Sequence, residues 1–108
     1  TYQLFHVDNL GIFYHVKVQV NRYILTNMYF VYILECSDKT LYVGSTNDVE
    51  RRLHQHNNLK SGAHYTKIRR PVILRYTESF ESKGEALSRE AKIKKLKREE
   101  KKALCIKK

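Results

Sequence analysis

The stretch from residue 29 to residue 56 constrains the fold of this chain more than any other. Two short apolar runs, Tyr29–Cys36 and Leu41–Ser45, are rich in β-branched and aromatic residues, and a turn-like segment, 37–40, separates them. Runs of this composition are typical of paired β-strands. The residues at 46–48 are Thr, Asn and Asp, which are favoured at helix N-caps. We therefore predict a β-hairpin that leads directly into a helix.

The length of the hairpin turn decides which side chains share a face of the sheet. A loop of four residues would put Tyr32 and Tyr42 on opposite faces, because side chains alternate along a strand. A three-residue loop, Ser37–Lys39, would pair Tyr32 with Gly44, and both tyrosines would then face the same way. Such loops commonly end in a residue with positive φ, which here is Lys39. If the two tyrosines act together, the sequence predicts the odd-numbered loop or a bulge.

The predicted helix carries two pairs of side chains spaced four residues apart. Val49 and Leu53 form an apolar pair for packing. Arg52 and His56 form the second pair and lie beside that apolar stripe. The hairpin and the helix therefore bring two phenols, a guanidinium and an imidazole into one region.

The second half of the chain predicts one more strand and two more helices. Residues 59–70 are polar and basic and are expected to form a loop, and the alternation that follows predicts a strand over 72–80. The pattern Ser-x-x-Glu that starts at Ser82 is a capping box, which predicts a helix to about Leu96. A short basic helix is expected over 97–106.

The buried face of the capped helix contains an unusual residue. Its apolar side is expected to consist of Ala86, Leu87, Ala91 and Ile93. Glu90 lies one turn from Ala86, Leu87 and Ile93, on or next to the buried face. A carboxylate in that position is costly unless it is paired or binds a cation.

Residues 1–27 allow two interpretations, and both stay open. The only methionine is Met28, directly before the hairpin, so one interpretation is that the natural product starts there and that 1–27 is an upstream extension. The other is a real extra strand, because apolar and polar residues alternate from Ile12 to Asn21. In either case the residues from 28 to 108 are expected to form the functional domain.

The charge of the chain is high and unevenly distributed. Its 21 Lys and Arg residues against 11 Asp and Glu residues give a formal net charge of +10. Residues 1–65 hold six basic and five acidic residues, whereas residues 66–108 hold fifteen and six. A field of this kind favours a polyanionic partner, most simply nucleic acid. The alternative is a small basic protein whose charge serves solubility alone.

The cysteines and the apolar runs exclude several classes of protein. Cys36 and Cys105 are too few and too far apart for a disulfide framework or a zinc pattern, and they suit a reducing compartment. No apolar run approaches the length of a membrane span, and no signal-peptide pattern is present. We expect a cytoplasmic protein without a membrane partner.

The candidate residues suit the hydrolysis of a phosphodiester. This reaction needs a base for water, a cation at the phosphate and help for the leaving oxygen. Arg52 can clamp phosphate oxygens, and His56 or a tyrosine can take or relay a proton. Glu90 can hold one hard divalent ion that keeps most of its waters. Taken singly, these residues have ordinary alternatives: packing tyrosines, a solvated arginine, and a salt bridge from Glu90 to Lys94.

The joint spacing of these residues resembles the GIY-YIG nuclease family. Phe30-Val31-Tyr32 is followed ten residues later by Tyr42-Val43-Gly44, and Arg52 lies ten residues further on. The family's metal-binding glutamate is matched by Glu90 within Leu87–Ala91. The resemblance runs from Met28 to about Ile106 and is closest to the small, stand-alone, single-domain branch (UPF0213-like).

The resemblance implies an α/β (α+β) fold, with a small antiparallel sheet of about three strands and helices packed on it. It also implies hydrolysis with one divalent ion, Mg²⁺ or Mn²⁺. Tyr32 and Tyr42 would be the motif tyrosines, one of which is expected to activate water. Arg52 would stabilise the phosphate, His56 holds the place of a family histidine or tyrosine, and Glu90 would bind the metal.

The chain departs from the family pattern at several positions. Phe30 replaces a glycine, and Val31 and Val43 replace isoleucine. Ser45 stands where some members carry a lysine, so one phosphate contact is absent. We expect no second domain for targeting, so specificity would come from the structure of the substrate, from a protein partner or from the basic C-terminal helices.

The leading prediction is therefore a metal-dependent endonuclease that acts on DNA rather than RNA, in repair or recombination. The basic residues expected to contact nucleic acid are Lys67, Arg69, Arg70, Arg89, Lys94 and Lys95. The alternative is a catalytically weak or inactive nucleic-acid-binding module. A third hypothesis is a regulatory module of the same fold that binds protein.

Overall fold

The core of the molecule is a three-stranded antiparallel sheet with the strand order β4-β3-β5. The computed structural model describes residues 2–7, 13–18 and 28–106. The central strand is β3 (Tyr29–Glu35), and the edge strands are β4 (Leu41–Thr46) and β5 (Ile73–Phe80). The three-stranded antiparallel sheet expected from the family resemblance is therefore confirmed.

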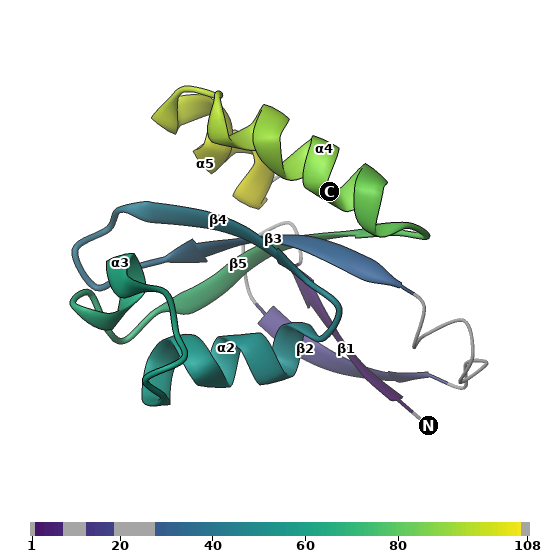
Figure 1. Ribbon diagram of the computed structural model, residues 1–108, viewed down its shortest axis with the longest axis horizontal. Helices are drawn as coiled ribbons and strands as arrows, with labels where there is room; N and C mark the ends of the chain where they lie inside the picture. Colours follow the sequence, from purple (N-terminus) through teal and green to yellow (C-terminus); the bar gives the residue numbers. More distant parts are fainter. Residues whose placement is uncertain (1, 8–12, 19–27, 107–108) are drawn as a thin grey trace.

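Helices cover both faces of this sheet (Figure 1). One face carries α2 (Val49–Asn58), with the short helix α3 (His64–Lys67) beside it. The opposite face carries α4 (Lys83–Lys94) and α5 (Arg98–Ile106). Because the central strand is covered on both sides, four consecutive residues of β3, Val31–Leu34, are buried.

The alternation of side chains along β3 divides the interior into two clusters. Val31 and Ile33 pack with the α4 and α5 side chains, including Ile93. Tyr32 and Leu34 point the other way, toward α2. The first cluster is mainly aliphatic, whereas the second contains the buried phenol.

The hairpin turn has the geometry that puts both motif tyrosines on one face. Tyr32 pairs with Gly44, and Leu34 pairs with Tyr42. The turn is closed by a hydrogen bond of 2.8 Å from the Cys36 backbone N–H to the Thr40 carbonyl. Lys39 has a φ of 70°, in the left-handed region. The predicted three-residue loop with a positive φ at Lys39 is confirmed.

Both helix starts predicted from capping residues are present. The Asp48 side chain accepts a hydrogen bond from the Arg51 backbone N–H at the start of α2. The Ser82 side chain accepts from the Glu85 backbone N–H at 3.2 Å, and its hydroxyl donates to the Glu85 carboxylate. The sequence did not predict α3, which lies inside the expected loop and has no side-chain cap.

The buried side of α4 is narrower than the sequence predicted. Ala86 and Ile93 are buried, but Leu87 is 48% exposed and Ala91 is also exposed. Residues 86 and 93 lie two turns apart on one stripe, whereas Leu87 lies one residue around the helix from it. The expectation that Leu87 and Ala91 belong to the packed side was therefore wrong.

The described strands before Met28 form a separate two-stranded antiparallel sheet, made of β1 (Tyr2–Val7) and β2 (Phe13–Val18). A strand expected from the alternation in this segment is thus present. Whether residues 1–27 belong to the working domain stays a prediction. Among the described residues, no helix is long and apolar enough to cross a membrane.

Candidate active site

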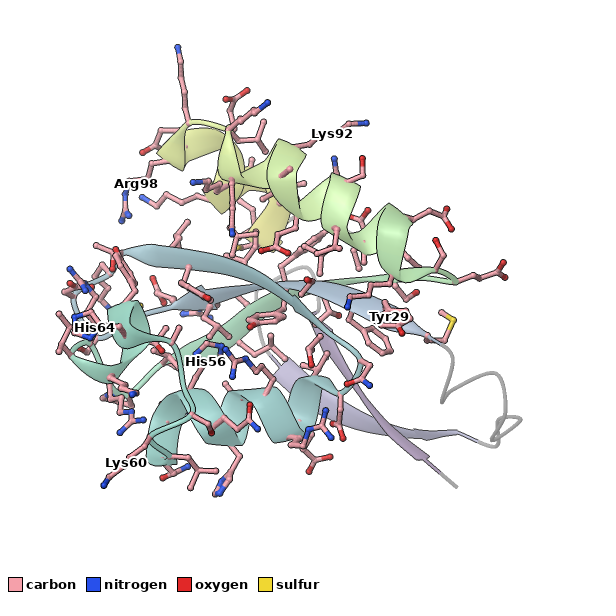
Figure 2. The ribbon with its side chains drawn as sticks, in the orientation of Figure 1. Tyr29, His56, Lys60, His64, Lys92 and Arg98 are labelled. Carbon is pink, nitrogen blue, oxygen red and sulfur yellow. The ribbon has the colours of Figure 1, made fainter. Side chains whose placement is uncertain are left out.

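A chain of buried hydrogen bonds links the central strand to both helices of the α2 face. The Tyr32 hydroxyl lies 2.8 Å from His56 Nε2, and His56 Nδ1 lies 2.8 Å from the Thr66 hydroxyl. Figure 2 shows His56 directed from α2 toward the sheet. His56 and Thr66 are both fully buried. The phenol, the imidazole and the hydroxyl therefore form one continuous polar chain in an otherwise apolar interior.

The second motif tyrosine packs directly against this chain. The Tyr42 ring centroid lies 5.1 Å from that of His56 and 6.4 Å from that of Tyr32. On its outer side Tyr42 stacks with Tyr65 of α3, at 6.0 Å and 28°. The Arg69 guanidinium lies 3.8 Å from the centroid of the Tyr65 ring. A row of aromatic and cationic groups thus extends from the buried phenol to the surface.

Arg52 lies beside the same phenol. One of its nitrogens donates to the Gln55 side chain at 2.8 Å and to the Ser61 carbonyl at 3.0 Å. Arg52 is also the charged group that most strongly opposes the rise in the pKa of Tyr32. The predicted set of Tyr32, Tyr42, Arg52 and His56 therefore meets at one place.

Burial sets the protonation states in this cluster. Burial raises the pKa of Tyr32 to about 12, against the opposing effect of Arg52. Burial, together with the positive charges of Arg52 and Arg70, lowers the pKa of His56 to about 4. At neutral pH the phenol is therefore protonated, and the imidazole is neutral.

The motif glycine is required by the close approach of the phenol. A Cβ atom added to Gly44 would lie 2.6 Å from Tyr32 Cζ and closer still to the hydroxyl. Tyr32 and Gly44 are cross-strand partners, so the ring lies over the glycine. Any larger residue at this position would displace the tyrosine from its partner His56.

Glu90 lies across the edge strand from these residues. It belongs to α4, which covers the face opposite α2 (Figure 1). Its Oε1 accepts a hydrogen bond of 2.7 Å from the Ser45 hydroxyl, and its Oε2 lies 2.7 Å from Lys94 Nζ. The charge of Glu90 nevertheless adds slightly to the rise in the pKa of Tyr32, which burial dominates. The structure thus places Glu90 apart from the four converging residues, near the rim formed by β4.

Glu90 is compatible with a metal that relies on water for most of its ligands. The described residues contain no group of three or more His, Cys, Asp or Glu side chains able to hold a metal. Mg²⁺ commonly binds through one or two carboxylates and keeps several waters. The Lys94 side chain on Oε2 is 55% exposed, so it can move away without opening the core. A single-carboxylate site therefore fits the residues that are present.

Two of the predicted nucleic-acid contacts are held by the fold around α3. Arg69 pairs with Asp38 at 3.0 Å and donates to the Tyr65 carbonyl. Arg70 donates to the carbonyls of His56 and Leu59, at 2.6 and 2.7 Å, and so caps the end of α2. Both guanidiniums therefore have structural partners, and their role toward nucleic acid stays a prediction.

The other four predicted contacts differ in their surroundings. Arg89 pairs with Glu78 at 3.1 Å, and Lys94 pairs with Glu90. Lys95 is exposed at the end of α4, and Lys67 is partly buried. Lys95 is thus the most accessible of the four to an incoming polyanion.

The residues that support this cluster carry little or no signal in the sequence. Thr66 sits in the unpredicted helix α3, and Ser61 contributes a backbone carbonyl, which has no sequence signal. Gly62 is required next to the cluster, because a Cβ atom at this position would lie 3.0 Å from the His56 Cα. Of these, only the glycine carried a signal, since an isolated glycine in a polar segment indicates a close backbone approach.

Comparison with known proteins places the cluster inside a known type of domain. A family model described as the GIY-YIG catalytic domain matches residues 28–103, a range that contains all five predicted catalytic and metal-binding residues. A UPF0213 protein of Halobacterium salinarum is 56% identical over 77 residues, which are 71% of this chain and 99% of that protein. A UPF0213 protein of Syntrophus aciditrophicus is 58% identical over 72 residues, 67% of this chain and 83% of that protein.

A solved structure is also similar. The solution NMR structure of a UPF0213 protein from Bacillus halodurans is 44% identical, and the match covers 71% of this chain and 81% of that one, with a TM-score of 0.46.

Proposed function

Because this chain belongs to the GIY-YIG family, we propose that it is a divalent-metal-dependent endonuclease that hydrolyses phosphodiester bonds in DNA. One observation carries the proposal: a buried phenol lies 2.8 Å from a neutral imidazole nitrogen, with a guanidinium beside it. A nucleic-acid substrate is what the family implies, and the basic C-terminal part of the chain suits it.

Tyr32 is the residue that activates water in this proposal. Its hydroxyl oxygen takes a proton from the attacking water while its own proton passes to His56 Nε2. The pKa values of these two groups in the free protein oppose this transfer, since burial and Arg52 disfavour the imidazolium. A bound phosphate brings negative charge next to Arg52 and thereby makes His56 a stronger base.

Arg52 and Tyr42 complete the half of the site that lies on the α2 face, which we call the tyrosine half; Glu90 forms the other half. Arg52 neutralises charge that develops on the phosphate, because its planar fork matches phosphate oxygens. Tyr42 keeps the imidazole in place through its edge-on contact at 5.1 Å and 63°. In this role Tyr42 is a positioning residue, whereas Tyr32 transfers the proton.

In this proposal Glu90 binds the metal ion, Mg²⁺ or Mn²⁺. When bound, the ion supplies positive charge to the phosphate and the leaving oxygen. Since Glu90 lies across the edge strand β4 from Tyr32, the substrate backbone would have to pass along that edge to meet both halves. The substrate in this proposal is distorted or branched DNA, such as intermediates of repair or recombination, with a protein partner as a second source of specificity.

The test is a cleavage assay on one sequence prepared as duplex, branched and single-stranded DNA and as RNA, with Mg²⁺ or Mn²⁺. We expect cleavage of DNA, strongest on the branched form. Glu90→Ala should lower the rate by about 1,000-fold with binding retained. Glu99→Ala is the matched control, because that carboxylate is 83% exposed on α5 and should leave the rate unchanged.

Binding without cleavage of any of these substrates, with either metal, would overturn the nuclease proposal. That outcome would favour the nucleic-acid-binding module, for which the pairing of Glu90 with Lys94 is the supporting observation. The absence of both binding and cleavage would leave the protein-binding module.

A further inference from the structure

We propose that Thr66 is a positioning residue that fixes the tautomer of His56, so that Nδ1 carries the hydrogen and Nε2 is free to accept a proton from Tyr32. This inference deepens the proposed nuclease and rests on it for its consequence in catalysis. The tautomer itself can be measured without any activity.

The direction of the hydrogen bonds follows from the Thr66 end of the hydrogen-bond chain. The Thr66 hydroxyl lies 2.9 Å from the Ala63 carbonyl, which can only accept. The single hydroxyl hydrogen is therefore used at that carbonyl. Toward His56 the hydroxyl offers only a lone pair, so Nδ1 must be the donor over the 2.8 Å contact.

The Tyr32 end of the hydrogen-bond chain leads to the same assignment of the tautomer. Arg52, whose guanidinium opposes the rise in the pKa of Tyr32, is a pure donor and cannot receive the phenolic hydrogen. The phenolic hydrogen is therefore directed to His56 Nε2, which must carry a lone pair. With the opposite tautomer, Nε2–H would face a phenol whose own hydrogen has no acceptor between Arg52 and the imidazole.

The surrounding residues hold Thr66 where it can do this. Its side chain is fully buried, although α3 has only four residues and no side-chain cap. Tyr65, the preceding residue, stacks on Tyr42 of the sheet. Arg69 packs on Tyr65 and pairs with Asp38 of the hairpin turn, which fastens this segment to the sheet. The hydroxyl is thus placed by contacts on both sides.

The tautomer matters because only an unprotonated Nε2 can take the proton of Tyr32. Thr66→Val keeps the shape of the side chain but leaves His56 Nδ1–H without an acceptor, at a cost that favours the other tautomer. Thr66→Ser keeps the hydroxyl. Loss of proton transfer typically lowers a rate by about 100-fold or more, so we expect a drop of about 100-fold in Thr66→Val and rescue in Thr66→Ser.

The deciding experiment is long-range ¹H–¹⁵N NMR of the full-length protein at pH 7. The His56 signals are identified by their loss in His56→Gln. We expect the Nδ1–H pattern in the wild type and in Thr66→Ser, and a shift toward Nε2–H in Thr66→Val. A wild type with the Nε2–H pattern, or a Thr66→Val spectrum that keeps the Nδ1–H pattern, overturns the proposal.

The two readouts separate the possible failures. If Thr66→Val does not fold, the wild-type spectrum alone still decides the tautomer. If the wild type cleaves nothing but shows the Nδ1–H pattern, the nuclease proposal fails while the assignment for Thr66 stands. If Thr66→Val changes the tautomer but cleaves at the wild-type rate, the role of Thr66 in catalysis is refuted.

Discussion

Two tyrosines, the buried Tyr32 on one face of the sheet and the half-buried Tyr76 on the other, differ in the partner of the phenolic hydroxyl. Burial raises the pKa of Tyr32 and of Tyr76 to about 12 in both cases. Tyr32 meets the neutral nitrogen of His56, whereas Tyr76 donates to the Glu78 carboxylate at 2.6 Å. Burial and a raised pKa therefore do not by themselves distinguish a reactive phenol from a structural one.

The partner of each tyrosine explains the difference. Glu78 is already bound to Arg89, so the Tyr76 network is closed by an ion pair and packs against the aliphatic cluster under α4. The Tyr32 network contains instead a neutral imidazole nitrogen that can take a proton, and Arg52 stands beside it. In the proposed function, the α2 face therefore holds the reacting groups, while the α4 face stabilises the fold and supplies one carboxylate at the rim.

The largest expected effect comes from removing each hydroxyl in turn. Tyr32→Phe should lower the cleavage rate by about 1,000-fold, because the proton path is lost. Tyr76→Phe should leave the rate nearly unchanged and lower the free energy of unfolding by about 1 kcal/mol, the net value of one hydrogen bond. Initial cleavage rates and urea unfolding of both variants test this prediction. Equal losses of rate in the two variants would show that the two tyrosines do not differ in function.

A second comparison uses two glycines. Gly44→Ala should lower the rate by about 100-fold, because the added Cβ displaces the phenol from His56. Gly84→Ala is the control: nothing lies within 4 Å of its added Cβ, and it sits in the first turn of α4. That variant should raise the free energy of unfolding by about 0.5–1 kcal/mol at an unchanged rate. Full activity of Gly44→Ala would show that the phenol does not need its present position.

The third prediction concerns the pH dependence of stability. The folded-state pKa of His56 is about 4, below the unfolded value of 6.5, so acid favours the unfolded state. Between pH 7.5 and pH 5 the His56 contribution should fall by about 2 kcal/mol, and the loss should be complete below pH 4.

Urea unfolding at the two pH values measures this change, with two variants for reference. His56→Gln should remove most of the pH dependence, whereas His54→Gln should not, because His54 is exposed on the same helix. If the free energy of unfolding of His56→Gln depended on pH as steeply as that of the wild type, the burial of a neutral imidazole on the α2 face would be contradicted.

The smallest effect is expected in the hairpin turn, which belongs to neither cluster. Lys39→Gly removes the steric cost of a φ of 70°, and the greater freedom of the unfolded chain offsets part of the gain. The free energy of unfolding should rise by about 0.5 kcal/mol, with the cleavage rate unchanged. Thermal melting and initial rates test this, and a change in rate would mean that the turn influences the position of Tyr32.

Local patterns in the sequence were sufficient for much of this fold. The alternation in β3 and β4, the positive φ at Lys39 and the capping residue Ser82 are encoded within a few neighbours. Four members of the site follow from the same local spacing, since a hairpin and one helix place Tyr32, Tyr42, Arg52 and His56.

The remainder depends on contacts between distant residues. A capping box states where α4 begins but not which face of the sheet it covers, so the position of Glu90 across β4 could not be predicted. The same holds for Leu87, whose exposure depends on how α4 is rotated. Thr66 lies in a helix of four residues that tertiary contacts hold in place.

The bond between Ser45 and Glu90 joins residues 45 positions apart in the chain. During synthesis, the hairpin and α2 leave the ribosome well before α4 does. A nascent chain, or one truncated before residue 83, would therefore carry the tyrosine half of the proposed site without its carboxylate. In the proposed endonuclease, cleavage would begin only once the C-terminal quarter of the chain had been made and folded, so an interrupted product would not cut the DNA around it.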